Sequence, residues 1–137
     1  MVTNPYCGVV AKFFDAIDCL EPFIIHGEGE QTRDFTYIDD AVSAILLAAT
    51  KEEAVGQVFN VGTGRETTVL QLGQMIAEAH GYEHYPVVHV PKRKVDTIQR
   101  RSLSIEFIKR TLNWVPQNTL EAGIQQTLNW LKEKNKS

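Results

Sequence analysis

The sequence has few cysteines and no long apolar run. Its two cysteines, Cys7 and Cys19, have neither the spacing of a metal site nor that of a redox motif. We expect both to be reduced, which is typical of a cytoplasmic protein. The first residues lack a basic segment followed by an apolar stretch, and no stretch approaches the length of a membrane span. We therefore predict neither a signal peptide nor a membrane partner.

An excess of positive charge is also absent. The chain carries 14 Lys and Arg against 17 Asp and Glu, which gives a net charge of −3. Its overall charge therefore gives no reason to expect nucleic acid as a partner. Basic residues do cluster at 92–94 and at 100–101, but such runs are most often solvated surface.

The size and composition are those of one compact domain. The chain has 137 residues, of which 43% are hydrophobic and 23% are charged. We expect residues 1–131 to form a single lobe and residues 132–137 to fray as a tail.

Apolar residues recur at helical spacing in five segments. We predict helices over residues 9–20, 40–50 and 104–112, and a closing helix that begins at Thr119. A further helix begins at a capping box formed by Thr68 and Gln71, and Gly81 ends it. For the helix at 40–50 we expect Asp39 or Asp40 as the N-cap.

Short segments rich in β-branched and aromatic residues lie between these helices. We predict strands over residues 22–26, 34–38, 57–61 and 85–90. The alternation of strands and helices indicates the α/β class. Because the strands are few and short, we expect a small mixed lobe of about five helices rather than a complete Rossmann domain.

Residues 27–40 carry the most informative pattern. Gly27 and Gly29 predict a turn, and Arg33 follows at the start of a predicted strand. A guanidinium held there can present its planar fork to a phosphate. Local chemistry alone favours a simpler hairpin, in which Arg33 pairs with a nearby carboxylate.

The whole string, GEGEQTRDFTYIDD, resembles a segment of the extended short-chain dehydrogenase family, Gly-x-Gly-x-Gln-x-Arg-Asp-Phe-x-x-x-x-Asp. That family includes UDP-glucose 4-epimerases and related dehydratases. The resemblance implies that Arg33 contacts the diphosphate of a nucleotide sugar. It also implies that Ile24 and His26 flank the uracil ring, although family members usually carry Tyr or Phe where this chain has His26.

The resemblance extends in both directions along the chain. Upstream, YCGVVAKFF at 6–14 is similar to a loop-into-helix segment, which implies that the backbone near Gly8 and Val9 touches the nucleotide. Downstream, RKVD at 93–96 resembles an Arg-x-x-Asp pair. It implies a diphosphate contact for Arg93, and for Asp96 either a ribose hydroxyl contact or a role in holding that arginine.

Two further segments match the family. GQVFNVGTG at 56–64 resembles its strand and glycine turn, and LNWVP at 112–116 resembles its Leu-Gly-Trp-x-Pro ending. Asn113 replaces the usual glycine at this helix stop, where Asn also tolerates the left-handed conformation.

Two patterns suggest other sites. The turn at 62–64 lies where a dinucleotide fingerprint would, but Thr67 occupies the place of the third glycine, so we predict a plain strand-to-helix turn. His80 and His84 are four residues apart with Gly81 between them, so we predict no metal site.

The resemblance implies NAD as the cofactor of the whole enzyme, in which the tyrosine of a Tyr-x-x-x-Lys pair moves a proton. None of Tyr6, Tyr37, Tyr82 and Tyr85 is followed by a lysine four residues later, and the NAD-binding glycine loop is not present. We expect no catalytic residue, no NAD binding and no turnover by this chain alone, and Tyr37 to be a sheet residue.

Three hypotheses follow. The chain is the nucleotide-sugar-binding portion of an epimerase, dehydratase or decarboxylase, with a UDP-sugar as ligand and the missing N-terminal half as partner. Alternatively, it is a self-sufficient binding module, or it associates with a second copy through exposed apolar surface.

Overall fold

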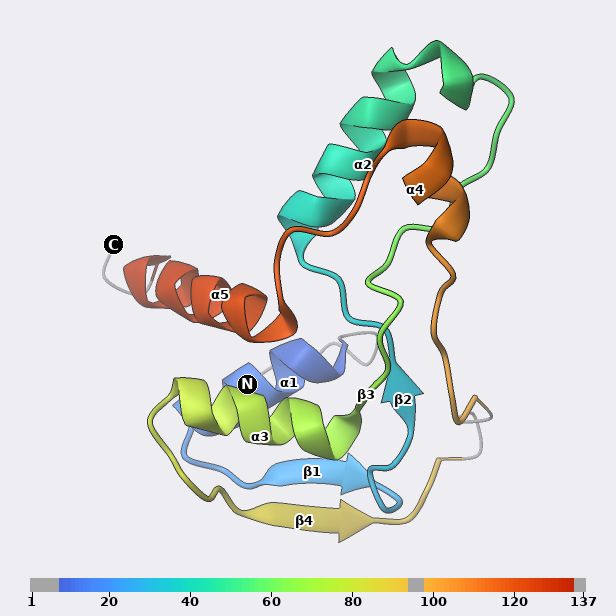
Figure 1. Ribbon diagram of the computed structural model, residues 1–137. Coiled ribbons are helices and arrows are strands. Elements are labelled where there is room, and N and C mark those ends of the chain that lie inside the picture. The colour runs from blue at the N-terminus through green and yellow to red at the C-terminus, as the bar shows by residue number, and fades with distance from the viewer. Residues whose placement is uncertain (1–7, 94–97, 135–137) are drawn as a thin grey trace.

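The structure, a computed structural model, describes residues 8–93 and 98–134. In chain order its elements are α1 (Val9–Asp18), β1 (Phe23–His26), β2 (Thr32–Arg33), α2 (Ile38–Thr50), the 3-10 turn η1 (Glu52–Ala54), β3 (Thr67–Thr68), α3 (Val69–Ala79), β4 (Val87–Val90), α4 (Glu106–Leu112) and α5 (Leu120–Lys134) (Figure 1). The described residues thus form a small mixed α/β lobe, as predicted, and not a complete Rossmann domain.

The strands of the described residues form two separate pairs. β1 pairs with β4 in parallel, with Phe23 opposite Val87. β2 pairs with β3 in antiparallel fashion, with Arg33 opposite Thr67. α3 contacts α1, α5 and β1, so it lies at the centre of the packing.

One hydrophobic core joins α1, β1, α3 and α5. The rings of Phe13 and Phe23 stack within it at a centroid distance of 4.5 Å. A Cβ atom at Gly73 would lie 3.3 Å from each of these rings, so the glycine lets α3 approach them closely. The buried members of this core are Phe13, Phe14, Ile17, Phe23, Ile25, Val69, Leu72, Ile76, Ala77, Ile124 and Leu128.

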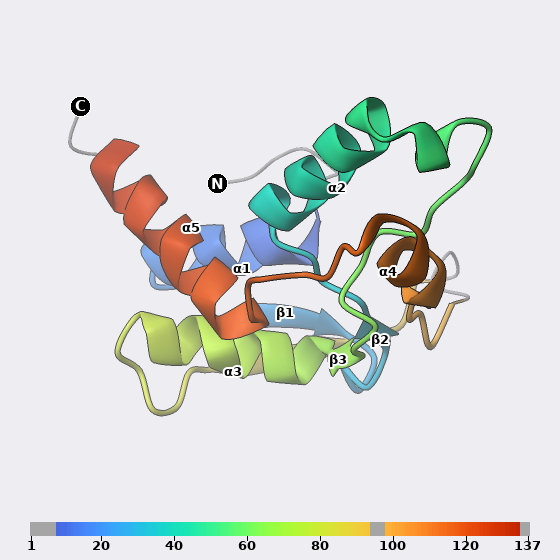
Figure 2. The ribbon, with the colours of Figure 1, turned by 45° about the horizontal axis from the view of Figure 1, so that its top comes forward.

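A second, smaller core joins α2, η1 and α4, which project away from α1 and α3 (Figures 1 and 2). The indole N–H of Trp114 donates to Ser43 Oγ at 2.8 Å and fixes the chain after α4 against α2. The buried members are Ala44, Ala54, Ile108, Leu112 and Trp114.

Asp40 is the one buried charged residue of the described chain, with 2% of its surface exposed. Our prediction that Asp39 or Asp40 caps α2 is wrong, because the N-cap position is Tyr37 and no side chain caps it. The Asp40 carboxylate instead accepts hydrogen bonds from the backbone N–H groups of Gln117 and Asn118. These residues precede α5, so Asp40 ties α2 to the start of that helix.

Two predicted strands are wrong. Residues 34–38 do not pair, because the Asp34 side chain accepts hydrogen bonds from residues 63, 64 and 103 and α2 already begins at Ile38. Tyr37 is accordingly not a sheet residue, and its ring packs against Gly123 of α5. Residues 57–61 have no pairing strand among the described residues, and Val58 is 88% exposed.

The other predicted helices and strands agree with the structure, with shifts of a few residues at their ends, whereas β2, η1 and β3 were not predicted. Thr68 and Gln71 form the predicted capping box of α3. Asn113 follows α4 in the left-handed conformation, with φ 53°. α5 continues to Lys134, into the expected tail, while residues 135–137 lie outside the described residues. None of the described helices has the length and apolar character that crossing a membrane requires.

Candidate functional site

The predicted base-flanking residues lie on β1. Ile24 points out of the core and is 50% exposed, whereas its neighbours Phe23 and Ile25 are buried. His26 ends the strand, and its ring Nδ1 lies 3.3 Å from the carbonyl oxygen of Pro91. Since β1 and β4 are parallel, the end of β1 lies beside the segment that leads from β4 to Arg93.

Arg33, the predicted diphosphate ligand, is the last residue of β2 and is half-buried. Its Nη1 donates to the carbonyl oxygens of Thr32 at 2.6 Å and of Ile98 at 3.1 Å. No ion pair with a described carboxylate accompanies these hydrogen bonds, which differs from the hairpin alternative. A guanidinium has five N–H groups, so contacts at Nη1 leave the fork able to donate to a further oxygen ligand.

The remaining predicted residues are more scattered. Gly8 is the N-cap of α1 and Val9 is its first residue. Figure 1 shows the first turn of α1 and the carboxyl ends of β1 and β2 at the same end of the lobe. Arg93 is exposed just beyond β4, and Asp96 lies outside the described residues. The described part of the predicted set therefore lies toward one end of the lobe, but on separate elements.

Asp34, the residue after Arg33, fills the glycine turn that resembles a dinucleotide fingerprint. Its carboxylate accepts the backbone N–H groups of Thr63 and Gly64, both at 2.9 Å, and the hydroxyl of Thr63 at 2.6 Å. A Cβ atom at Gly62 would lie 2.8 Å from the same carboxylate. The N–H groups that a cofactor phosphate would use are thus already satisfied, and this turn does not fit NAD.

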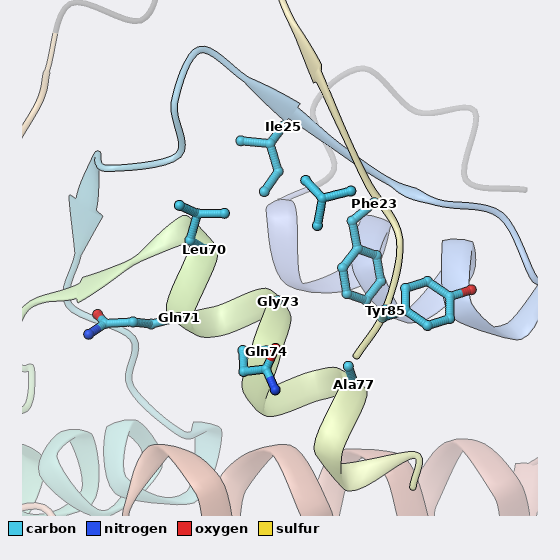
Figure 3. A pocket seen from close by; sticks show the side chains of 9 residues that line it. Phe23, Ile25, Leu70, Gln71, Gly73, Gln74, Ala77 and Tyr85 are labelled. Carbon is cyan, nitrogen blue, oxygen red and sulfur yellow. The ribbon is translucent and has the colours of Figure 1, made fainter. Parts of the chain in front are cut away.

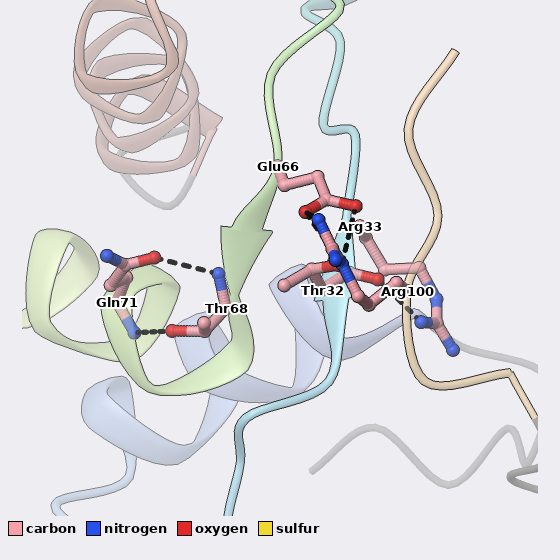
Figure 4. A network of polar contacts seen from close by, with 6 residues as sticks. All are labelled: Thr32, Arg33, Glu66, Thr68, Gln71 and Arg100. Atoms are coloured by element: carbon pink, nitrogen blue, oxygen red, sulfur yellow. Dashed lines mark hydrogen bonds and ion pairs between the residues drawn. The ribbon is translucent and has the colours of Figure 1, made fainter.

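A polar link beside Arg33 was not predicted from the sequence. Arg100 Nη2 and Glu66 Oε2 form an ion pair at 2.8 Å, and Arg100 Nε adds hydrogen bonds at 3.1 and 3.3 Å (Figure 4). The hydrogen bond from Arg100 lowers the pKa of Glu66, and the hydrogen bond to Glu66 raises the pKa of Arg100. The two residues are 34 positions apart, so no local pattern could have indicated the pair.

The lobe also has an apolar hollow of about 310 Å³ between α3 and the β1–β4 pair (Figure 3). Phe23, Ile25 and Tyr85 line one side, and Leu70 and Ala77 line the other. It shares no residue with the predicted nucleotide site.

Two other kinds of site would involve histidine and cysteine side chains. Within residues 8–93 and 98–134, no group of three or more His, Cys, Asp or Glu side chains could hold a metal ion. His80 ends α3 as its C-cap residue, and its Nδ1 lies 2.7 Å from the carbonyl oxygen of Ile76. Cys19 is an exposed free thiol, and Cys7 lies outside the described residues.

A family model described as GDP-mannose 4,6 dehydratase matches residues 8–127. The chain belongs to this family. The match confirms the resemblance to the extended short-chain dehydrogenases that act on nucleotide sugars.

Individual relatives support this membership. A UDP-N-acetyl-alpha-D-glucosaminuronate decarboxylase of Bacillus cytotoxicus is 31% identical over 135 residues, which cover 95% of this chain and 41% of that protein. The crystal structure of a UDP-glucose 4-epimerase from Thermotoga maritima, solved with UDP-glucose, is 39% identical with a TM-score of 0.85. The match covers 96% of this chain and 42% of that one.

A more distant structure shows the same fold. It is a UDP-glucuronic acid 4-epimerase from Bacillus cereus in complex with UDP-glucuronic acid and NAD, 22% identical with a TM-score of 0.84. The match covers 93% of this chain and 40% of that one. The chain thus spans about two-fifths of the length of the family members that it matches.

Proposed function

We propose that this chain is the nucleotide-sugar-binding portion of an NAD-dependent sugar epimerase or dehydratase, with a UDP-sugar as its ligand. The observation that carries the proposal is the position of Arg33. Two backbone carbonyls hold its guanidinium at the end of β2, beside the glycine turn of the family motif. A preorganised guanidinium binds a diphosphate more tightly than a mobile one, because less side-chain entropy is lost on binding.

The other predicted ligands would contact the base, the diphosphate and the ribose. Ile24 and His26 would flank the base from the outer face of β1, where Ile24 is half exposed. Arg93 would add a second cation beyond β4, and Gly8 and Val9 would offer backbone at the start of α1. Asp96 stays a predicted ribose or arginine contact. The 39% identity to a UDP-glucose 4-epimerase favours UDP over other nucleotides.

In this proposal the chain supplies binding and orientation, and a second lobe supplies NAD and the proton-transferring residues. The Asp34-filled turn supports this division, since it does not offer its N–H groups to a cofactor phosphate. The lack of a Tyr-x-x-x-Lys pair supports it as well. Binding energy from the nucleotide, which does not react, orients the sugar for chemistry elsewhere.

We propose that the second lobe docks on the outer face of α2. Among the residues of this helix only Asp40 and Ala44 are buried, while Ile45 is 64% and Leu46 is 60% exposed. The exposed apolar side chains of this helix, which we call the α2 face, are Ile38, Val42, Ile45 and Leu46. A helix that is apolar on its outer side as well is typical of one buried in a larger assembly.

The occupant we favour is the lobe that the family members possess beyond the matched region, because this chain accounts for only 41% of the Bacillus cytotoxicus relative. A second copy of the chain is the competing occupant, and it corresponds to the alternative of an oligomerisation module. We also propose a cytoplasmic location, which the exposed free thiol of Cys19 supports.

The nucleotide proposal is tested by calorimetric titration of the chain with UDP and with uridine. We expect Arg33→Ala to weaken UDP binding about tenfold or more, as loss of a charge-assisted hydrogen bond implies. Uridine lacks the diphosphate, so its affinity should not change. Arg110→Ala, which removes an exposed arginine from α4, is the matched control and should leave both affinities unchanged. Equal UDP binding by the chain and Arg33→Ala would refute the assigned role of Arg33.

A further inference from the structure

The Glu66–Arg100 ion pair crosses over β2. Glu66 directly precedes β3, which pairs with one edge of β2. Arg100 belongs to a segment on the opposite edge, where the N–H of Thr32 donates to the carbonyl of Gln99 at 2.8 Å. The pair therefore joins the two segments that flank β2, as Figure 4 shows.

The segment that carries Arg100 also holds Arg33. The carbonyl of Ile98, two residues before Arg100, accepts a hydrogen bond from Arg33 Nη1 at 3.1 Å. In Figure 4 the guanidinium of Arg33 points away from Glu66 and toward this segment. Glu66 and Arg100 thus act on Arg33 only through the backbone that lies between them.

This segment is irregular and lies at the surface of the lobe. Residues 98–102 have no regular secondary structure and are exposed. The ion pair adds three hydrogen bonds from the Arg100 guanidinium, and a carboxylate that binds a guanidinium at two nitrogens also restricts its direction. A ligand-binding side chain keeps its geometry when the groups that support it are themselves held.

We propose that Glu66 and Arg100 are positioning residues for Arg33. By fixing residues 98–100 along β2, they hold the Ile98 carbonyl where it orients the guanidinium toward a nucleotide diphosphate. This inference rests on the proposed function, since it takes the diphosphate as the ligand of Arg33.

The test compares Glu66→Gln and Arg100→Gln with the exchanged pair, Glu66→Arg combined with Arg100→Glu. Arg101→Gln is the matched control, because it removes the same charge from the neighbouring exposed residue. Titration with UDP should show affinity about two- to fivefold lower for each single variant, the factor expected from loss of an exposed ion pair. Uridine affinity should not change, and the exchanged pair should recover most of the UDP affinity.

A second measurement separates this inference from the proposed function. Hydrogen exchange of the Thr32 amide and of the Arg33 side-chain N–H groups, followed by NMR, reports the positioning without any ligand. Both should exchange faster in the single variants, and Arg101→Gln should leave them unchanged. If UDP does not bind the chain at all, the proposed function fails for the isolated chain, while these exchange rates still decide whether the pair holds Arg33.

Two outcomes would overturn the inference. Unchanged exchange at Thr32 and Arg33 would show that the pair does not hold the segment. Faster exchange with unchanged UDP affinity would show that it only supports the fold.

Discussion

The carboxylate of Asp40 accepts two hydrogen bonds from Asn118, one from its backbone N–H and one from its side-chain amide, each at 3.1 Å. The two residues are 78 positions apart, and Asp40 is almost fully buried. The carboxylate therefore connects the α2 part of the molecule with the chain that enters α5.

Asp40→Ala should lower the free energy of unfolding by about 3 kcal/mol, because it leaves the amide donors of residues 117 and 118 without an acceptor. Urea unfolding followed by circular dichroism measures this loss. Asp39→Ala is the control, since Asp39 is exposed in the same helical turn. Its cost should stay within about 1 kcal/mol, the range of a helix-dipole interaction. Equal losses at the two positions would contradict the structural role of Asp40.

Gly29→Ala should destabilise the chain more than Gly56→Ala. Both glycines have positive φ, at 77° and 70°, so both substitutions carry a backbone cost of about 1–2 kcal/mol. Only at Gly29 would the new Cβ clash, since it would lie 2.7 Å from Leu70 Cγ, whereas Gly56 has no neighbour within 4 Å. We expect an additional loss of about 1–3 kcal/mol for Gly29→Ala, as overpacking implies. Thermal unfolding measures the difference, and adding Leu70→Ala should recover part of it.

Stability should depend on pH through Glu66. Its hydrogen bond with Arg100 lowers the folded-state pKa below the ordinary value of 4.5. The stabilisation is therefore fully present above pH 4.5 and is lost as the pH falls through the lower folded pKa. The difference in unfolding free energy between the chain and Glu66→Gln should be constant near neutral pH and should disappear in acid. A difference that grows on acidification would refute this assignment.

The α2 face should matter for association and not for folding. Ile45→Glu combined with Leu46→Glu should change the free energy of unfolding by no more than about 0.5 kcal/mol for each substitution, since both side chains are exposed. The chain should co-purify with the remaining part of the Thermotoga maritima epimerase when the two are expressed together, and the double variant should not. Trp130→Glu, at an exposed position on α5, is the control.

Sedimentation velocity tests whether a second copy of the chain, rather than another lobe, occupies the α2 face. If the chain forms a dimer in solution and the double variant is a monomer, the α2 face binds a second copy of the chain. Co-purification that the double variant leaves intact would place the contact elsewhere.

Features that depend on neighbouring residues were predictable from the sequence. The Thr68–Gln71 capping box and the left-handed Asn113 both follow from local hydrogen bonding and backbone preference. The helices were predictable for a similar reason, because their apolar spacing is set within a few turns.

Features that depend on residues far apart in the chain were not predictable from the sequence. Residues 57–61 have the composition of a strand, but a strand forms only where another strand pairs with it. Asp34 and Asp40 have the sequence context of a strand and of a helix cap, and their partners lie far along the chain. The family resemblance predicts Arg33 and Arg93 as diphosphate ligands, which stays a prediction, and it gave no indication of the Glu66–Arg100 pair that lies beside Arg33.

The parallel pairing of β1 and β4 has a consequence for how this lobe folds as it is synthesised. Gly27 and His89, which meet at the end of this pair, are 62 residues apart. β1 therefore leaves the ribosome well before the strand that pairs with it, and the edge of β1 that faces β4 stays unpaired during that interval. The nascent chain is therefore exposed to aggregation at least for the time needed to synthesise residues 27–90, and slow long-range pairing adds to that time.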